Sequence, residues 1–182
     1  LTPASVMRLQ KQGMLAFYLG EHAQARRTLE RSASIGITSK MFDYQSMVLL
    51  AFARFRDRDS KGLQRCADNL RHVLERHGES RRLMRFTALV DALCLMINRQ
   101  PARVLEQLRR LAQDIQRPDY DVEAALNMVS LLSELGAADL QVEESSGWIE
   151  TLALRFSVSK SLTELLAGAA KVHPPYADAV RA

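Results

Sequence analysis

The stretch MLAFYLGEHAQARRTLERSASIG, residues 14–36, predicts a helical hairpin. Apolar residues recur at helical spacing on both sides of Gly20 and Glu21, and these two residues interrupt the pattern as a turn does. We therefore expect one helix over about residues 3–19. A second helix should follow the turn and end at Gly36, because glycine suits the left-handed position after a helix.

The remaining sequence repeats the same order of helix starts, polar turns and helix ends. The turns are separated by 39, 41 and 36 residues and centre near Gly20, Asp59, Gln100 and Gly136. Periods of this length are typical of helical repeat proteins, because one hairpin cannot bury its apolar face alone and uses its neighbours. The predicted hairpins span about residues 2–36, 38–78, 80–116 and 119–156, and a terminal helix is expected at about residues 158–173.

Residues that favour helix N-termini precede several of the predicted helices. Thr38 or Ser39 is placed to cap the helix that follows the first hairpin. Ser80 and Asp121 precede long apolar runs, so we expect further helices to begin directly after them.

The composition agrees with an all-α protein. Only 8 glycines and 5 prolines occur among 182 residues, and good helix formers dominate the rest. With 47% apolar and 25% charged residues, the chain has the make-up of a globular protein. We expect a single helical repeat domain over residues 1–182.

The first predicted hairpin resembles a tetratricopeptide repeat. In that alignment Gly13 falls on the close-packing glycine of the first helix and Gly20 on the turn. Ala25, Leu29 and Ser32 fall on the small, large and small positions of the second helix. The resemblance implies that these residues pack the two helices together. It also implies a right-handed superhelical stack of about four antiparallel hairpins, closed by the C-terminal capping helix.

The sequence departs from the tetratricopeptide pattern at several positions. The expected aromatic residue of the first helix is displaced to Phe17 and Tyr18, and Ile37 replaces the closing proline. The later hairpins lack the glycines and exceed the usual length of about 34 residues. The chain is therefore tetratricopeptide-like rather than a strict repeat.

Residues suited to catalysis or metal binding are sparse. No Gly-rich phosphate loop, GxSxG, HExxH or CxxC motif occurs. His72 and His77 lie roughly 140° apart around a helix, too far for one shared metal. Residues 57–68, DRDSKGLQRCAD, imitate a calcium loop, but Lys61 stands where an oxygen ligand is needed. We expect no enzyme, no cofactor and no metal site.

The cysteines and the hydropathy pattern indicate where the chain resides. Cys66 and Cys94 lie in apolar helical stretches, and no secretory leader opens the sequence, so we interpret them as buried free thiols in a reducing compartment. The absence of an apolar run of about eighteen residues predicts no membrane span. We expect a cytoplasmic protein. Because residue 1 is leucine, we also expect a fragment of a longer polypeptide.

Charge is distributed unevenly along the chain. Residues 54–110 hold 14 Arg and Lys against 7 Asp and Glu, a net charge of +7. Residues 119–155 hold 8 acidic residues against one basic residue, a net charge of −7. Both zones fit solvated surface. The basic zone also fits an acidic protein partner, and the two oppositely charged zones could meet between two copies of the chain. Few aromatic residues accompany the basic ones, which argues against nucleic acid.

These observations together favour a scaffold for protein–protein interaction. Residues 147–182 are similar to the end of bacterial response regulators in which tetratricopeptide repeats follow a receiver domain, which implies a regulatory or output module of signal transduction or transcription. The alternatives are a small-ligand-sensing repeat domain of a transcriptional regulator, a helical enzyme and a nucleic-acid-binding module. The predicted partner-binding side chains are Gln10, Tyr18, Tyr44, Met47, Arg81, Arg82, Arg85 and Asp91.

Overall fold

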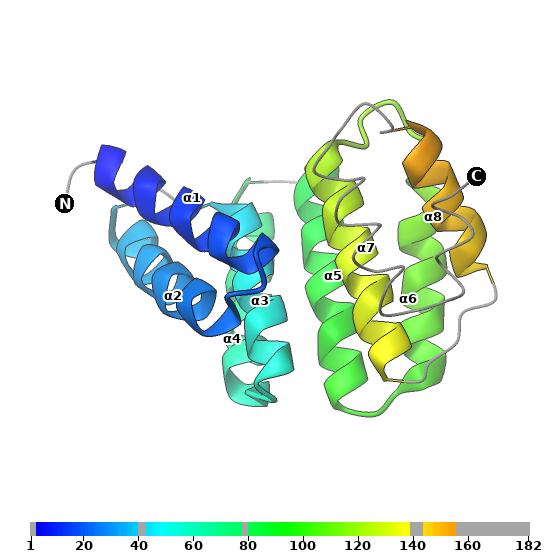
Figure 1. Cartoon of the computed structure of the whole chain (residues 1–182), viewed down its shortest axis with the longest axis horizontal. Coiled ribbons are helices and arrows are strands. Elements are labelled where there is room, and N and C mark those ends of the chain that lie inside the picture. Colours follow the sequence, from blue (N-terminus) through cyan, green and yellow to red (C-terminus); the bar gives the residue numbers. More distant parts are fainter. Residues whose placement is uncertain (1–2, 40–42, 78–79, 139–143, 156–182) are drawn as a thin grey trace. The chain divides into compact units, whose positions relative to one another are not determined.

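The structure is a computed structural model of the chain, and it describes residues 3–39, 43–77, 80–138 and 144–155. All regular elements among these residues are α-helices, which confirms the predicted all-α class (Figure 1). In order they are α1 (Pro3–Tyr18), α2 (His22–Ser39), α3 (Tyr44–Arg56), α4 (Ser60–His77), α5 (Arg81–Ile97), α6 (Pro101–Gln113), α7 (Val122–Ala137) and α8 (Ser145–Arg155).

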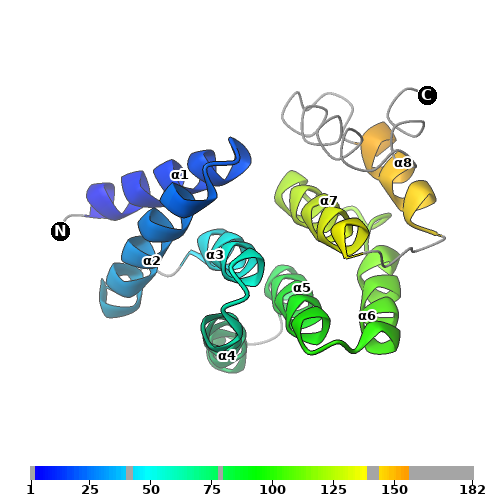
Figure 2. The ribbon, with the colours of Figure 1, turned by 60° about the horizontal axis from the view of Figure 1, so that its bottom comes forward.

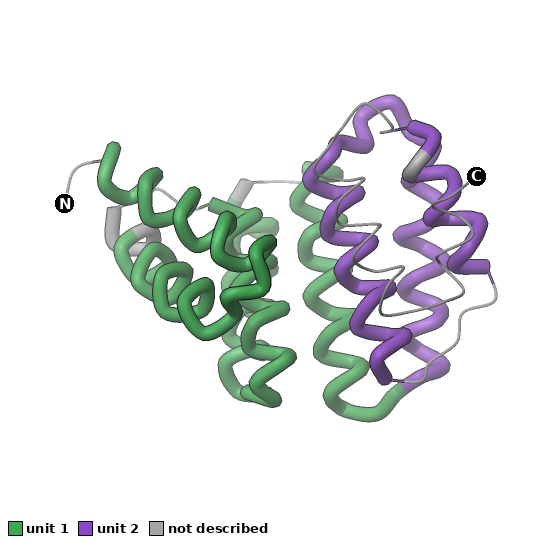
Figure 3. Tube along the Cα trace, viewed as in Figure 1, with its two compact units in different colours: residues 1–100 green, residues 101–182 purple. Residues whose placement is uncertain are grey.

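The chain divides into two compact units (Figure 3). Unit 1 covers residues 1–100 and contains α1 to α5, and unit 2 covers residues 101–182 and contains α6 to α8. The prediction that residues 1–182 form a single repeat domain stays a prediction.

In unit 1, α3 is the central helix. It packs against α1, α2, α4 and α5, while α1 also packs against α2, and α4 against α5 (Figures 1 and 2). Every residue from Gln45 to Ala53 is buried, as expected for a helix with apolar residues around most of its circumference. The first helices of successive predicted hairpins, α1, α3 and α5, are therefore in contact in chain order.

The same backbone motif ends α1, α3 and α5. After α1, the N–H of Gly20 donates to the carbonyl of Phe17 at 3.0 Å and that of Glu21 to Ala16 at 2.9 Å, with Gly20 at φ 81°. This pair of bonds is a Schellman motif, which satisfies carbonyls that the helix leaves open.

Arginine takes the place of glycine at the other two ends. After α3, the backbone N–H of Arg58 donates to the carbonyl of Phe55 at 3.0 Å and that of Asp59 to Arg54 at 2.9 Å. After α5, the N–H of Arg99 donates to the carbonyl of Met96 and that of Gln100 to Leu95, both at 3.0 Å. Their φ angles are 55° and 54°, in the left-handed region that few residues other than glycine adopt. The turns expected near residues 20, 59 and 100 therefore lie within one residue of these three left-handed positions.

The predicted end of the second helix is wrong. Gly36 lies inside α2, which continues to Ser39, so Thr38 and Ser39 do not cap the next helix. Asp43 caps α3 instead, and its side chain accepts a hydrogen bond from the N–H of Ser46 at 3.2 Å. A glycine inside a helix costs only about 1 kcal/mol, which packing can offset.

The predicted starts of α5 and α7 are confirmed. Ser80 is the N-cap residue of α5, although its side chain makes no capping hydrogen bond. Asp121 caps α7 and accepts from the N–H of Ala124 at 2.8 Å. Gly136 lies in the last turn of α7 rather than beyond it. The terminal helix expected at about residues 158–173 lies outside the described residues.

In unit 2, α7 packs against α8, and Arg155 ties the end of α8 to the loop between α6 and α7. Its guanidinium donates to the carbonyls of Ile115, Arg117 and Tyr120, and it lies 5.9 Å from the ring centroid of Tyr120. One side chain therefore satisfies three carbonyls that follow α6. None of the described helices combines the length and the apolar character needed to cross a bilayer.

Candidate functional site

The residues that the tetratricopeptide resemblance assigned to packing lie where α1 meets α2. A Cβ atom at Gly13 would lie 2.7 Å from Cγ and Cδ2 of Leu29, so only glycine fits there without movement. Ala25, Leu29 and Ser32 are buried on α2. Gly20 provides the left-handed turn between the two helices.

The predicted partner-binding residues do not form one exposed surface. Arg81 and Arg82 are exposed, whereas Tyr18, Tyr44 and Asp91 are half-buried. It buries Gln10, Met47 and Arg85. The prediction of a binding face that includes these last three side chains needs correction, because a buried side chain offers no surface to a partner.

Two of the half-buried residues make contacts within unit 1. Gln45 Nε2 donates to the Tyr18 hydroxyl at 3.1 Å, which links α3 to α1. Arg71 on α4 donates to the carboxylate of Asp91 on α5. Burial raises the pKa of Asp91, although the Arg71 charge acts in the opposite direction. These side chains join neighbouring helices instead of facing solvent freely.

An aromatic and cationic cluster that the sequence pattern did not indicate joins α1, α2 and α3. The Phe17 ring packs at 5.7 to 6.0 Å, centroid to centroid, from Tyr18, His22 and Phe52. The Arg56 guanidinium carbon lies 5.2 Å from the Phe17 centroid, within cation–π range. Burial and the Arg56 charge lower the pKa of His22, which favours the neutral imidazole.

A second polar cluster connects α2, α3 and the start of α4. Arg54 donates to the Gly62 carbonyl at 2.6 Å and pairs with Glu30 at 3.4 Å. Arg26 pairs with Glu30 at 3.2 Å and with Asp57. Two arginines and two carboxylates therefore bridge the first predicted hairpin to the second.

The calcium-like stretch is occupied by other contacts. Asp57 pairs with Arg26, Asp59 accepts from the Gly62 N–H at 2.8 Å, and Asp68 accepts from Gln64 and Arg71 at 2.9 Å. A Cβ at Gly62 would contact the Asp59 carboxylate, so packing explains this glycine without an ion. Within the residues that the structure describes, no group of three His, Cys, Asp or Glu side chains is placed to hold a metal.

Both thiols are buried and free. Burial raises the pKa of Cys66 and of Cys94 to about 11. The Arg54 guanidinium lies 3.6 Å from the Cys66 sulfur and opposes the effect of burial without reversing it. A thiol with such a pKa is protonated at neutral pH, which makes it a poor nucleophile.

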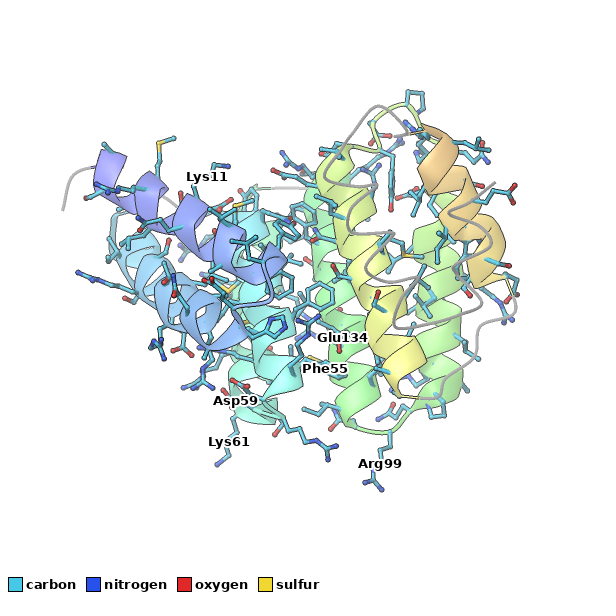
Figure 4. The ribbon with its side chains drawn as sticks, in the orientation of Figure 1. Lys11, Phe55, Asp59, Lys61, Arg99 and Glu134 are labelled. Carbon is cyan, nitrogen blue, oxygen red and sulfur yellow. The ribbon has the colours of Figure 1, made fainter. Side chains whose placement is uncertain are left out.

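Several exposed basic side chains have no acidic partner in the described part of the chain. Lys61 and Arg99 extend outward from helix ends in Figure 4, where both are labelled. This set, which we call the basic surface, is distributed along α4 and over the ends of α3 and α5, and it comprises Arg58, Lys61, Arg65, Arg76, Arg81 and Arg99. In unit 2, by contrast, exposed Glu144 pairs with Arg109 at 3.0 Å.

The sequence matches no protein-family model, and comparison with curated proteins and with solved structures gives no significant match.

Proposed function

We propose that this chain is a scaffold for protein–protein interaction. In this proposal it serves as the regulatory or output module of a bacterial protein of signal transduction or transcription. Its hairpins follow one another in a right-handed, tetratricopeptide-like superhelical stack, and the partner is a protein with an acidic surface.

Two features of unit 1 support the repeat architecture. The helices α1, α3 and α5 pack in succession, and each ends in a Schellman motif at residue 20, 58 or 99. A repeat protein is expected to use the same turn at the same place in each unit, because neighbouring units stack through equivalent surfaces.

The basic surface is the observation that supports an acidic partner. Its side chains are exposed, and none of them forms an ion pair with a carboxylate of the described residues. Unneutralised cations attract acidic proteins over distances near the Debye length, about 8 Å at physiological salt, and raise the rate of association. They also favour one orientation of the partner over others.

A photo-crosslinking experiment tests the proposal in the source cell. A benzophenone amino acid replaces Arg65 or Arg81 in the natural full-length protein, and mass spectrometry identifies the crosslinked proteins. We expect the same protein from both positions, with an acidic surface, and no crosslink to it from an exposed position on α2 such as Arg31. If neither position on the basic surface yields a specific protein, the proposal is wrong.

A further inference from the structure

The outward face of α1 carries a continuous row of exposed side chains, three of them apolar. Met7, Leu15 and Leu19 are 54%, 61% and 65% exposed, and exposed Lys11 stands between the first two. Figure 4 shows Lys11 extending from α1 on the side opposite α2. We call Met7, Lys11 and Leu15 of α1, together with Leu19 directly after its end, the outer ridge.

The spacing of the outer ridge distinguishes it from scattered surface leucines. Its members follow one another at intervals of four residues, so they form one ridge that spans about 18 Å along the helix. Single exposed apolar residues are common, whereas neighbouring exposed apolar residues such as Leu15 and Leu19, with polar residues around them, are typical of a contact surface. Such i±4 ridges fit between the side-chain rows of another helix.

Charge indicates what kind of helix fits the ridge. No acidic residue occurs anywhere in α1, and exposed Arg8 stands beside Lys11. Neither cation pairs with a carboxylate of the described residues. A second α1 ridge would bring these like charges together, whereas an amphipathic helix with carboxylates beside its apolar stripe would satisfy both features.

We propose that the outer ridge binds an acidic amphipathic helix of a partner protein. The binding mode is helix against helix, with leucine-sized side chains of the partner beside Met7, Leu15 and Leu19. Carboxylates of the partner would meet Arg8 and Lys11. This inference rests on the proposed scaffold function and assigns it a specific site, separate from the basic surface.

Two synthetic peptides test the ridge directly. The first is a helix-forming 18-residue peptide with leucines along one stripe and glutamates beside them, and the second has lysine in place of each glutamate. Binding to the intact chain is measured by fluorescence anisotropy at physiological salt. We expect the acidic peptide to bind and the basic peptide to bind at least about tenfold more weakly.

Matched variants assign binding to the ridge. The double variant Leu15→Ser/Leu19→Ser should weaken binding of the acidic peptide at least about tenfold. The control Leu154→Ser removes a leucine that is 73% exposed on α8 and should leave binding unchanged. Lys11→Glu should reduce the preference for the acidic peptide, whereas Arg31→Glu, at an exposed position on α2 outside the basic surface, changes net charge equally and should not. Circular dichroism verifies that each variant keeps its helices.

Three outcomes would overturn the inference. The first is equal binding of the acidic and the basic peptide, and the second is an equal loss of acidic-peptide binding in the Leu154→Ser control. The third is self-association of the chain, measured by sedimentation velocity, that Leu15→Ser/Leu19→Ser abolishes. A second copy of the chain would then be the occupant of the ridge. The crosslinking experiment separates this inference from the broader proposal. If crosslinks at Arg65 and Arg81 persist while the peptide fails to bind, the scaffold function stands and the ridge assignment fails.

Discussion

Gly13 of α1 and Leu29 of α2 approach so closely that a Cβ atom on the glycine would lie 2.7 Å from two carbons of the leucine. Leu29 is fully buried, so its side chain has little room to move. The two helices of the first hairpin therefore meet at a position that admits no side chain.

Gly13→Ala should destabilise unit 1 by up to about 2 kcal/mol, because overpacking outweighs the gain of about 1 kcal/mol in helix propensity. In a Leu29→Ala background the clash with the leucine side chain is absent, so Gly13→Ala should stabilise unit 1 through its higher helix propensity. Urea unfolding followed by circular dichroism gives the four free energies of this double-mutant cycle. The same sign in both backgrounds would contradict the close contact.

Gly147 on α8 provides a control for helix propensity alone. A Cβ there would meet nothing within 4 Å, and its φ is not positive. Gly147→Ala should therefore stabilise unit 2 by about 0.5 to 1 kcal/mol. Fluorescence of Trp148, the single tryptophan of the chain, reports unfolding of this unit.

The three Schellman motifs predict substitutions of opposite sign. Gly20→Ala should lower the free energy of unfolding by about 1 kcal/mol, because φ at this position is 81°, a conformation that alanine adopts poorly. Steric contact is not the cause, since an added Cβ would meet nothing within 4 Å. Arg58→Gly and Arg99→Gly should each stabilise unit 1 by about 0.5 to 1 kcal/mol, since the backbone of both arginines lies in the left-handed region that glycine adopts more easily. Thermal unfolding of the single variants measures each effect. A loss of stability in both arginine variants would show that left-handed strain is absent there.

The sequence predicted the helices and most turns because those depend on local patterns. Apolar periodicity predicted α3 and α5. The polar residues near Asp59 and Gln100 predicted two turns, each within one residue of the observed left-handed position at Arg58 or Arg99. The end of α2 was missed at Gly36, because a glycine inside a helix costs only about 1 kcal/mol and does not by itself end the helix, which continues to Ser39.

The candidate site was harder to predict than the fold. Apolar residues surround most of α3, so the pattern did not distinguish a partner-binding face of this helix, and Met47, assigned to such a face, is buried. The cluster of Phe17, His22 and Arg56 joins residues up to 39 positions apart, which no local spacing reveals. The cluster forms only when the folded chain brings α1, α2 and α3 together.

The polar cluster between the first two hairpins predicts unequal roles for its arginines. The Arg54 side chain is 13% exposed, whereas Arg26 is 38% and its partner Asp57 46% exposed. Arg54→Ala should cost about 2 kcal/mol, because Gly62 and Glu30 lose a charged donor. Arg26→Ala should cost less than about 1 kcal/mol because solvent screens exposed pairs. Equal costs in urea unfolding would contradict this ranking.

The raised thiol pKa values predict slow alkylation and a loss of stability at high pH. Because the pKa of Cys66 and Cys94 is about 11 when folded and near 9 when unfolded, the unfolded chain releases protons first. Stability from this source is complete below pH 9 and falls between pH 9 and 11. At pH 8, iodoacetamide should label neither thiol until urea unfolds the chain. Rapid labelling of the folded chain would contradict the burial.

Reversing the charge of Arg81, a member of the basic surface, and of its exposed neighbour Arg82 to glutamate tests electrostatic recognition of the crosslinked partner. Both residues are exposed at the first two positions of α5, where acidic residues suit the helix dipole, so folding should change by less than about 0.5 kcal/mol. Arg85 is left unchanged, because it is buried and its reversal would damage the fold. The association rate measured by biolayer interferometry should fall in the double variant and should also fall as salt rises beyond about 0.1 M. The control Arg27→Glu/Arg31→Glu makes the same charge change on α2, outside the basic surface, and should slow association less. Association that is independent of salt, or that responds equally to both double variants, would show that the basic surface does not guide the partner.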